Sequence, residues 1–128
     1  QFLHMVRLLR DRRQGLALSA FNQLDRSIDQ LILTAAGEPF LEHTLRPLHT
    51  VFRRIGYLYH THLTDGQSLE PTVDRHLAIL NAIANGHADK AVAASDALIG
   101  FVDDMFERME NDIDPALLDS SIEPLIVL

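Results

Sequence analysis

The feature that most constrains the fold is the spacing of the apolar residues, which recur every three to four positions along nearly the whole chain. Phe21, Leu24 and Ile28, for example, fall on one face of a helix. Runs that alternate apolar and polar residues, as β-strands do, are absent. The sequence therefore predicts an all-α protein, built as an antiparallel bundle of about five to six helices.

Turn residues divide the pattern into helices. Gly37 before Pro39, and Asn85 before Gly86, are typical of helix ends. Pro47 lies inside a longer periodic segment and predicts either one bent helix or two. The predicted helices cover about 1–9, 16–36, 39–63, 68–85 and 88–109, and 111–128 follows with no predicted packing.

Two long apolar stripes are predicted to face the interior of the bundle. The first lies in the segment that contains Pro47, and the second lies in the last predicted helix. Their members are Phe40, Leu41, Leu45, Leu48, Phe52, Ile55 and Leu58, and then Ala91, Ala94, Leu98, Phe101, Val102, Met105 and Phe106.

Length, charge and cysteine content limit the function. A chain of 128 residues, 47% of them hydrophobic, suits one domain over 1–128. A formal net charge of −7 disfavours direct binding to DNA phosphates or to an anionic membrane. Zero cysteines leave carboxylates and seven histidines as metal ligands, and we expect a cytoplasmic protein with no membrane contact. Because the chain opens at Gln1, we expect it to be part of a longer protein.

Asp25 and Asp29 are the first candidate site residues. They are four positions apart, so both lie on one face of their helix, at the edge of its apolar stripe. Two carboxylates there repel each other, which predicts a cation, a shared proton or an arginine nearby. The alternative is a solvated face with Asp29 pointing to water.

His76, Arg53 and Arg54 are the other candidates. His76 falls beside the buried side of its helix, where an imidazole either binds a ligand or is satisfied by a hydrogen bond. Arg53 and Arg54 lie between two apolar residues, so at least one could point inward and receive a carboxylate. The alternative for the arginines is a surface position in which the guanidinium reaches water.

Several stretches carry a family resemblance through their order and spacing. The most specific is His76-x-x-Ile79-x-x-Ala82-Ile83-x-x-Gly86. Over about residues 21–102 the chain resembles the FCD domain, the C-terminal effector-binding domain of GntR-type transcriptional regulators of the FadR subgroup. The stretches are Leu24–Asp29, Ala35–Leu41, Phe52–Arg54, Arg75–Gly86 and Lys90–Ala94.

The resemblance implies a helical domain that forms a homodimer and binds a small organic acid, often over a divalent metal. It also implies that operator DNA is bound only through an N-terminal winged helix-turn-helix domain, which is expected upstream and is absent from these 128 residues. The implied activity is regulation of transcription by a non-enzymatic domain.

The resemblance also implies a metal site of one aspartate and three histidines. Asp25 matches the aspartate and His76 matches the second histidine, but Asp29 and Leu98 stand where the other two histidines are expected. Either a weak, oxygen-rich site for zinc, nickel or manganese remains on Asp25, Asp29 and His76, or no metal binds. The second reading is slightly favoured.

Three functions remain open at this point. The first is a sensor whose ligand contacts Asp25, Asp29, His76 and an Arg53 or Arg54 guanidinium. The second is a helical dimerisation or protein-interaction module that binds no ligand. The third and weakest is a metal-dependent hydrolase. We expect the first.

Overall fold

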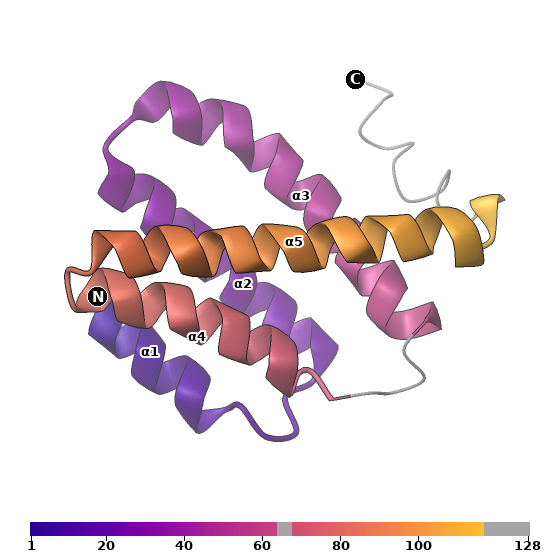
Figure 1. Cartoon of the computed structure of the whole chain (residues 1–128), viewed down its shortest axis with the longest axis horizontal. Helices are drawn as coiled ribbons and strands as arrows, with labels where there is room; N and C mark the ends of the chain where they lie inside the picture. Colours follow the sequence, from indigo (N-terminus) through magenta and orange to yellow (C-terminus); the bar gives the residue numbers. More distant parts are fainter. Residues whose placement is uncertain (64–67, 117–128) are drawn as a thin grey trace. The chain divides into compact units, whose positions relative to one another are not determined.

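The computed structural model describes residues 1–63 and 68–116, and within them it contains five α-helices and no strand (Figure 1). This confirms the all-α prediction and falls within the predicted number of helices. Residues 64–67 and the end of the predicted segment 111–128 lie outside the described residues. No helix among the described residues is both long enough and apolar enough to cross a membrane. The helices are α1 (Phe2–Asp11), α2 (Leu18–Ala36), α3 (Pro39–His62), α4 (Glu70–Ala84) and α5 (Ala88–Asp112).

Two helix ends fall where glycine predicted them. Gly37 follows α2 with φ 68°, and Gly86 follows α4 with φ 71°, a left-handed conformation that glycine adopts without steric cost. The N–H of Gly37 donates to the carbonyl oxygen of Thr34 at 3.2 Å. After α4, the N–H of His87 donates to the carbonyl oxygen of Ala82 at 2.9 Å. These bonds occupy carbonyls that the ending helix leaves without an intrahelical partner.

The segment around Pro47 is one helix. α3 runs without interruption from Pro39 to His62 and contains Pro47 in its interior. Proline has no N–H, so the carbonyl of His43 loses its usual partner four residues later. Of the two predicted outcomes, a single helix is the one observed.

The chain divides into two compact units. The first unit comprises 1–31 and 68–103, and the second comprises 32–67 and 104–128. The first contains α1, most of α2, α4 and the first part of α5, and the second contains α3 and the end of α5. The single domain over 1–128 stays a prediction.

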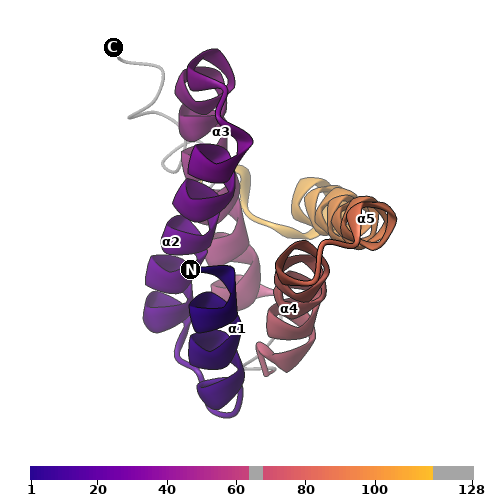
Figure 2. The ribbon, with the colours of Figure 1, turned by 90° about the vertical axis from the view of Figure 1, so that its left-hand side faces the viewer.

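The first unit has its core around α4, which lies alongside α1 (Figure 2). Leu9 of α1 and Val73 and Leu80 of α4 are fully buried. The stripe predicted on α2 is buried at Phe21, Leu24 and Ile28. Other buried side chains of this unit are Val6, Leu69, Leu77, Ile79 and Ala82.

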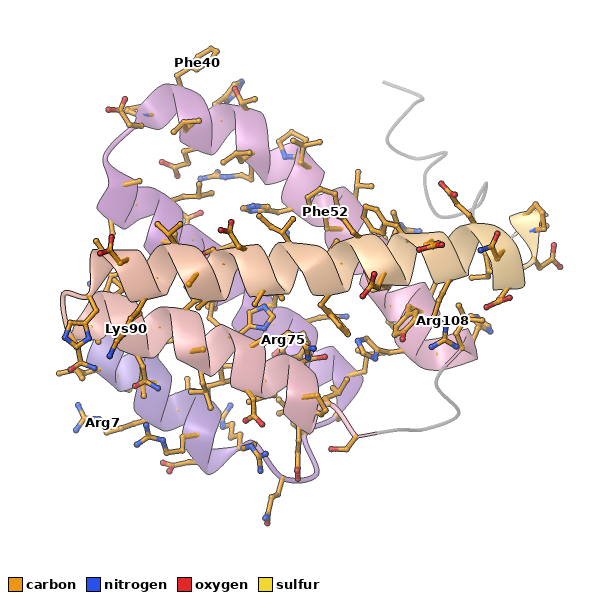
Figure 3. The ribbon with its side chains drawn as sticks, viewed as in Figure 1. Arg7, Phe40, Phe52, Arg75, Lys90 and Arg108 are labelled. Atoms are coloured by element: carbon orange, nitrogen blue, oxygen red, sulfur yellow. The ribbon has the colours of Figure 1, made fainter. Side chains whose placement is uncertain are left out.

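The second unit is held at one end by Arg108 of α5 (Figure 3). Its guanidinium donates to the hydroxyl oxygen of Tyr59 at 3.0 Å and to the carbonyl oxygen of Leu63 at 3.3 Å. Leu63 is the residue that ends α3, so the arginine places a cation at the negative end of that helix dipole. Phe52 and Phe106 are in ring contact nearby, with centroids 5.7 Å apart.

The two long stripes are less buried than predicted. On α3 only Leu58 of the predicted set is buried, while Phe40 is 79% exposed and Leu48 is 45% exposed. On α5 only Met105 of the predicted set is buried, and the others are half-buried. Spacing shows that residues share a face, but it does not show that a second element covers that face.

Leu80→Ala should lower the free energy of unfolding by about 3 kcal/mol, because it removes a fully buried side chain and leaves a cavity in the first unit. Urea denaturation measures this change. Ile99→Ala is the matched control, since Ile99 is 59% exposed and should change stability by less than about 0.5 kcal/mol. Equal losses in the two variants would contradict the placement of the core.

Candidate functional site

His76 projects from the middle of α4 into the first unit and is buried. Its Nδ1 lies 2.8 Å from the carbonyl oxygen of Thr72, one turn earlier on the same helix. Because a carbonyl only accepts, Nδ1 carries a proton and donates it to Thr72. This bond fixes the orientation of the ring and turns Nε2 away from the α4 backbone.

Asp25 receives that second nitrogen. Nε2 of His76 lies 3.1 Å from Oδ1 of Asp25 on α2, and the two side chains are only 11% and 15% exposed. Phe21, one turn before Asp25, packs edge-on against the imidazole with ring centroids 5.4 Å apart. The pair therefore sits against the apolar stripe of α2, where water competes little for its hydrogen bonds.

The surroundings of His76 favour its charged form. Burial by itself lowers the pKa of His76, but the hydrogen bond to Asp25 and the charge of Asp25 raise it. The Thr72 carbonyl and the charge of Asp29 raise it further, so the net pKa is above the ordinary value for histidine. Two acceptors and two nearby carboxylates thus outweigh desolvation.

Asp29 contributes its charge to this site. It lies one turn beyond Asp25 on α2, is half-buried and acts electrostatically on His76. Asp25 and Asp29 both favour the charged form of His76, so His76 is a candidate for the predicted cation beside the two carboxylates. Asp25 and His76 are in direct contact in the first unit, whereas Asp29 acts on His76 through its charge.

Arg53 and Arg54 belong to the other unit. Both lie on α3, where Arg53 is half-buried and Arg54 is exposed. Their part in anion binding stays a prediction. Leu98, which stands where the family resemblance expects a histidine, is a half-buried residue of α5.

The donor set does not match the four-ligand metal site that the resemblance implies. Leu98 offers no donor atom, and among residues 1–63 and 68–116 no three histidine or acidic side chains gather into a group that could hold a metal. Asp25 and His76 alone supply two adjacent donor atoms.

Sequence reasoning missed two parts of the site's surroundings. Thr72 was not predicted, although a carbonyl one turn before a buried histidine is a common acceptor. Arg13 was not among the predicted residues either, yet its guanidinium donates to Asp74 and lies within ion-pair distance of Glu70 on α4. The available signal was the pair of acidic residues four positions apart at the start of α4.

The comparisons with known proteins identify the family. The family model for the FCD domain matches residues 1–101. The chain belongs to the FCD family. FCD domains are the C-terminal, effector-binding domains of GntR-family transcriptional regulators, which are not enzymes. No curated protein and no solved structure matched the chain.

The buried pair should make the stability of this FCD domain depend on pH. The pKa of His76 is raised in the folded chain above the value of about 6.5 expected when unfolded. The stabilisation is therefore complete below about pH 6.5 and declines as pH rises through the raised folded-state pKa. Urea unfolding from pH 5.5 to 9 should show that decline, and His76→Gln should remove it.

His76→Gln should also lower the free energy of unfolding by about 3 kcal/mol at pH 6, because it leaves a buried carboxylate without its charged partner. Burial lowers the pKa of His60, so the titration of His60 changes the free energy of unfolding with pH in the opposite direction. The free energy of unfolding of the wild type minus that of His76→Gln removes this contribution and is the quantity to compare. His87→Gln, at an exposed histidine, is the control. If this difference in the free energy of unfolding does not change between pH 5.5 and 9, the pairing of His76 with Asp25 is contradicted.

Proposed function

We propose that this FCD domain senses a small organic acid at Asp25, Asp29 and His76 and, as a homodimer, modulates DNA binding by an N-terminal domain of a FadR-type regulator. The observation that carries the proposal is the buried Asp25–His76 pair inside a member of an effector-binding family. Buried ion pairs are weak devices for stability, because desolvation offsets most of the attraction. A buried ionisable residue with a specific charge partner is therefore a candidate for a binding site.

The charges of the site favour an effector with two kinds of polar group. The imidazolium of His76 is the group that attracts a carboxylate, and its Nε2 proton is the one a ligand could share with Asp25. Asp25 and Asp29 only accept hydrogen bonds, so they suit hydroxyl or amino groups on the same molecule. A hydroxylated or amino-bearing small acid satisfies both requirements.

We propose that recognition is direct, without a metal. Two of the four ligands that the family resemblance implies are replaced, by Asp29 and Leu98. Nε2 of His76, the nitrogen that would bind a metal, faces Asp25 at hydrogen-bond distance. In this arrangement the proton of the imidazolium supplies the positive charge that a metal ion would bring.

A thermal-shift screen of hydroxy and amino acids, with and without zinc, nickel or manganese, tests the proposal. A ligand present at a hundred times its dissociation constant stabilises the folded chain by about 2.7 kcal/mol, which raises Tm by several degrees. We expect such a shift without metal, and we expect Asp25→Asn and Asp29→Asn to abolish it.

Arg26→Gln is the control, because it removes an exposed charge on the same helix as the two aspartates. Arg53→Ala and Arg54→Ala show in the same screen whether a guanidinium contributes. A shift that requires added metal and is lost in His76→Gln would replace direct recognition with an oxygen-rich metal site. No shift with any acid would argue against the sensor.

A dimerisation module without a ligand is the second candidate. The observation in its favour is the apolar surface of α3, where several large side chains are exposed in the single chain. Its members are Phe40, Leu41, Leu48, Phe52 and Tyr57. Exposed apolar surface of this kind is typical of protein interfaces.

Sedimentation equilibrium should find a dimer whose dissociation constant rises by about tenfold or more in the double variant Phe40→Ser, Leu48→Ser, since each change removes apolar contact area. Val92→Ser is the control, because Val92 is also exposed but lies on α5. A monomeric wild type, or an unchanged dimer in the double variant, would exclude this surface as the interface.

A further inference from the structure

Arg13 makes a two-pronged ion pair with Asp74 in the first unit. It lies in the connection between α1 and α2. Its Nε donates to Oδ1 of Asp74 at 2.6 Å, and its Nη2 donates to Oδ2 at 2.8 Å. Nη1 lies 3.2 Å from a carboxylate oxygen of Glu70. This fork-to-fork geometry fixes the direction as well as the distance of the contact, and the hydrogen bond from Arg13 lowers the pKa of Asp74.

The start of α4 needs such a cation. Glu70 and Asp74 are four positions apart, so their carboxylates lie on the same side of the first turns of α4 and repel each other. Arg13 contacts both and relieves that repulsion. Isolated surface ion pairs contribute little, but a two-pronged arginine within a small network is the geometry in which they do contribute.

α4 carries two different contacts on opposite sides. Asp74 and His76 are two positions apart, which separates them by about 200° around the helix axis. Asp74 faces Arg13, and His76 faces Asp25 on α2. A roll of α4 about its axis moves opposite sides of the helix in opposite directions, so a roll that draws His76 away from Asp25 also displaces Asp74 relative to Arg13. Because the bonds from Arg13 to Asp74 are 2.6 and 2.8 Å long, a displacement of about 1 Å that the arginine does not follow lengthens them beyond hydrogen-bond distance.

The backbone connects Arg13 to both α1 and α2. The N–H of Arg13 donates to the carbonyl oxygen of Arg10, which ties Arg13 to the end of α1. Gly15 follows with φ 66°, a conformation in which other residues are strained, and α2 begins at Leu18. A continuous path of contacts thus leads from α1 through Arg13 to Asp74, along α4 to His76, across to Asp25 and back along α2.

We propose that Arg13 is a positioning residue that transmits the state of the Asp25–His76 pair to α1. Displacing His76 at one side of α4 weakens the ion pair of Arg13 at the other side, and with it one of the contacts that hold the end of α1 against α4. In its regulatory meaning this rests on the proposed function, since in an FCD protein the DNA-binding part lies on the α1 side of the chain. The mechanical coupling itself needs no ligand.

A mutant cycle read by amide hydrogen exchange tests the coupling in the chain as it stands. Asp25→Asn weakens the pair and serves as the disturbance at the site. We expect it to speed exchange in α1 by about two- to fivefold when Arg13 is present. In an Arg13→Gln background, α1 already exchanges faster, and adding Asp25→Asn should change it little further.

If Asp25→Asn changes the exchange rate of α1 less in the Arg13→Gln background than in the wild type, the result supports the proposal. If the two substitutions change the exchange rate by independent factors that simply multiply, the proposal is overturned. His76→Gln repeats the cycle from the other side of the pair, in case Asp25→Asn alone disturbs the site too little. Circular dichroism checks that each variant is folded. The charge swap Arg13→Asp with Asp74→Arg should restore slow exchange in α1 if the pair itself is responsible.

Arg7→Gln is the matched control. Arg7 is exposed on α1, points outward (Figure 3), and has no ion pair with any residue of 1–63 or 68–116. The same loss of charge there should leave the response to Asp25→Asn unchanged. If the mutant cycle shows coupling but no acid stabilises the protein in the thermal-shift screen, the coupling through Arg13 stands and the sensor proposal fails. If an acid stabilises the protein but the two substitutions act independently, the sensor proposal stands and the coupling through Arg13 fails.

Discussion

The hydrogen bonds of His76 are the constraint around which the first unit is arranged. An imidazole buried against Phe21 must satisfy both of its nitrogens, because an unpaired polar atom in an apolar interior is costly. Thr72 satisfies one from within α4, and Asp25 satisfies the other from α2. The second bond ties the register of α2 to that of α4, since only one turn of each helix brings the two groups to 3.1 Å. Apolar packing alone specifies such a register less sharply.

Much of the fold could be predicted from local signals in the sequence. Helix periodicity and the glycines at 37 and 86 placed most helix ends to within a few residues, because a glycine at positive φ is a backbone requirement that neighbours rarely override. The stripe on α3 was a weaker guide. Its spacing shows one apolar face, but whether another element covers that face depends on contacts far apart in the sequence.

The sequence named Asp25, Asp29 and His76 as candidate site residues but did not name Thr72 or Arg13. Asp25, Asp29 and His76 were named because two carboxylates at helical spacing beside an apolar stripe repel each other, and because the family resemblance places His76 with Asp25. Arg13 was missed because a run of arginines at a helix end is ordinarily solvated, and its partners on α4 lie 57 and 61 residues further along the chain. Only the folded arrangement shows which of several nearby arginines meets that acidic pair.

The family resemblance expects a histidine where Asp29 stands, and a carboxylate at that position changes the charge of the site. A set of imidazoles with one carboxylate gathers positive charge by binding a metal, and an acid then binds to the metal. Here two carboxylates act on one histidine, and they favour its charged form by raising its pKa. On our proposal of direct recognition, the effector's acidic group competes with Asp25 for the Nε2 proton. Binding therefore acts on the bond that holds α4 to α2, and recognition and structural change become one event.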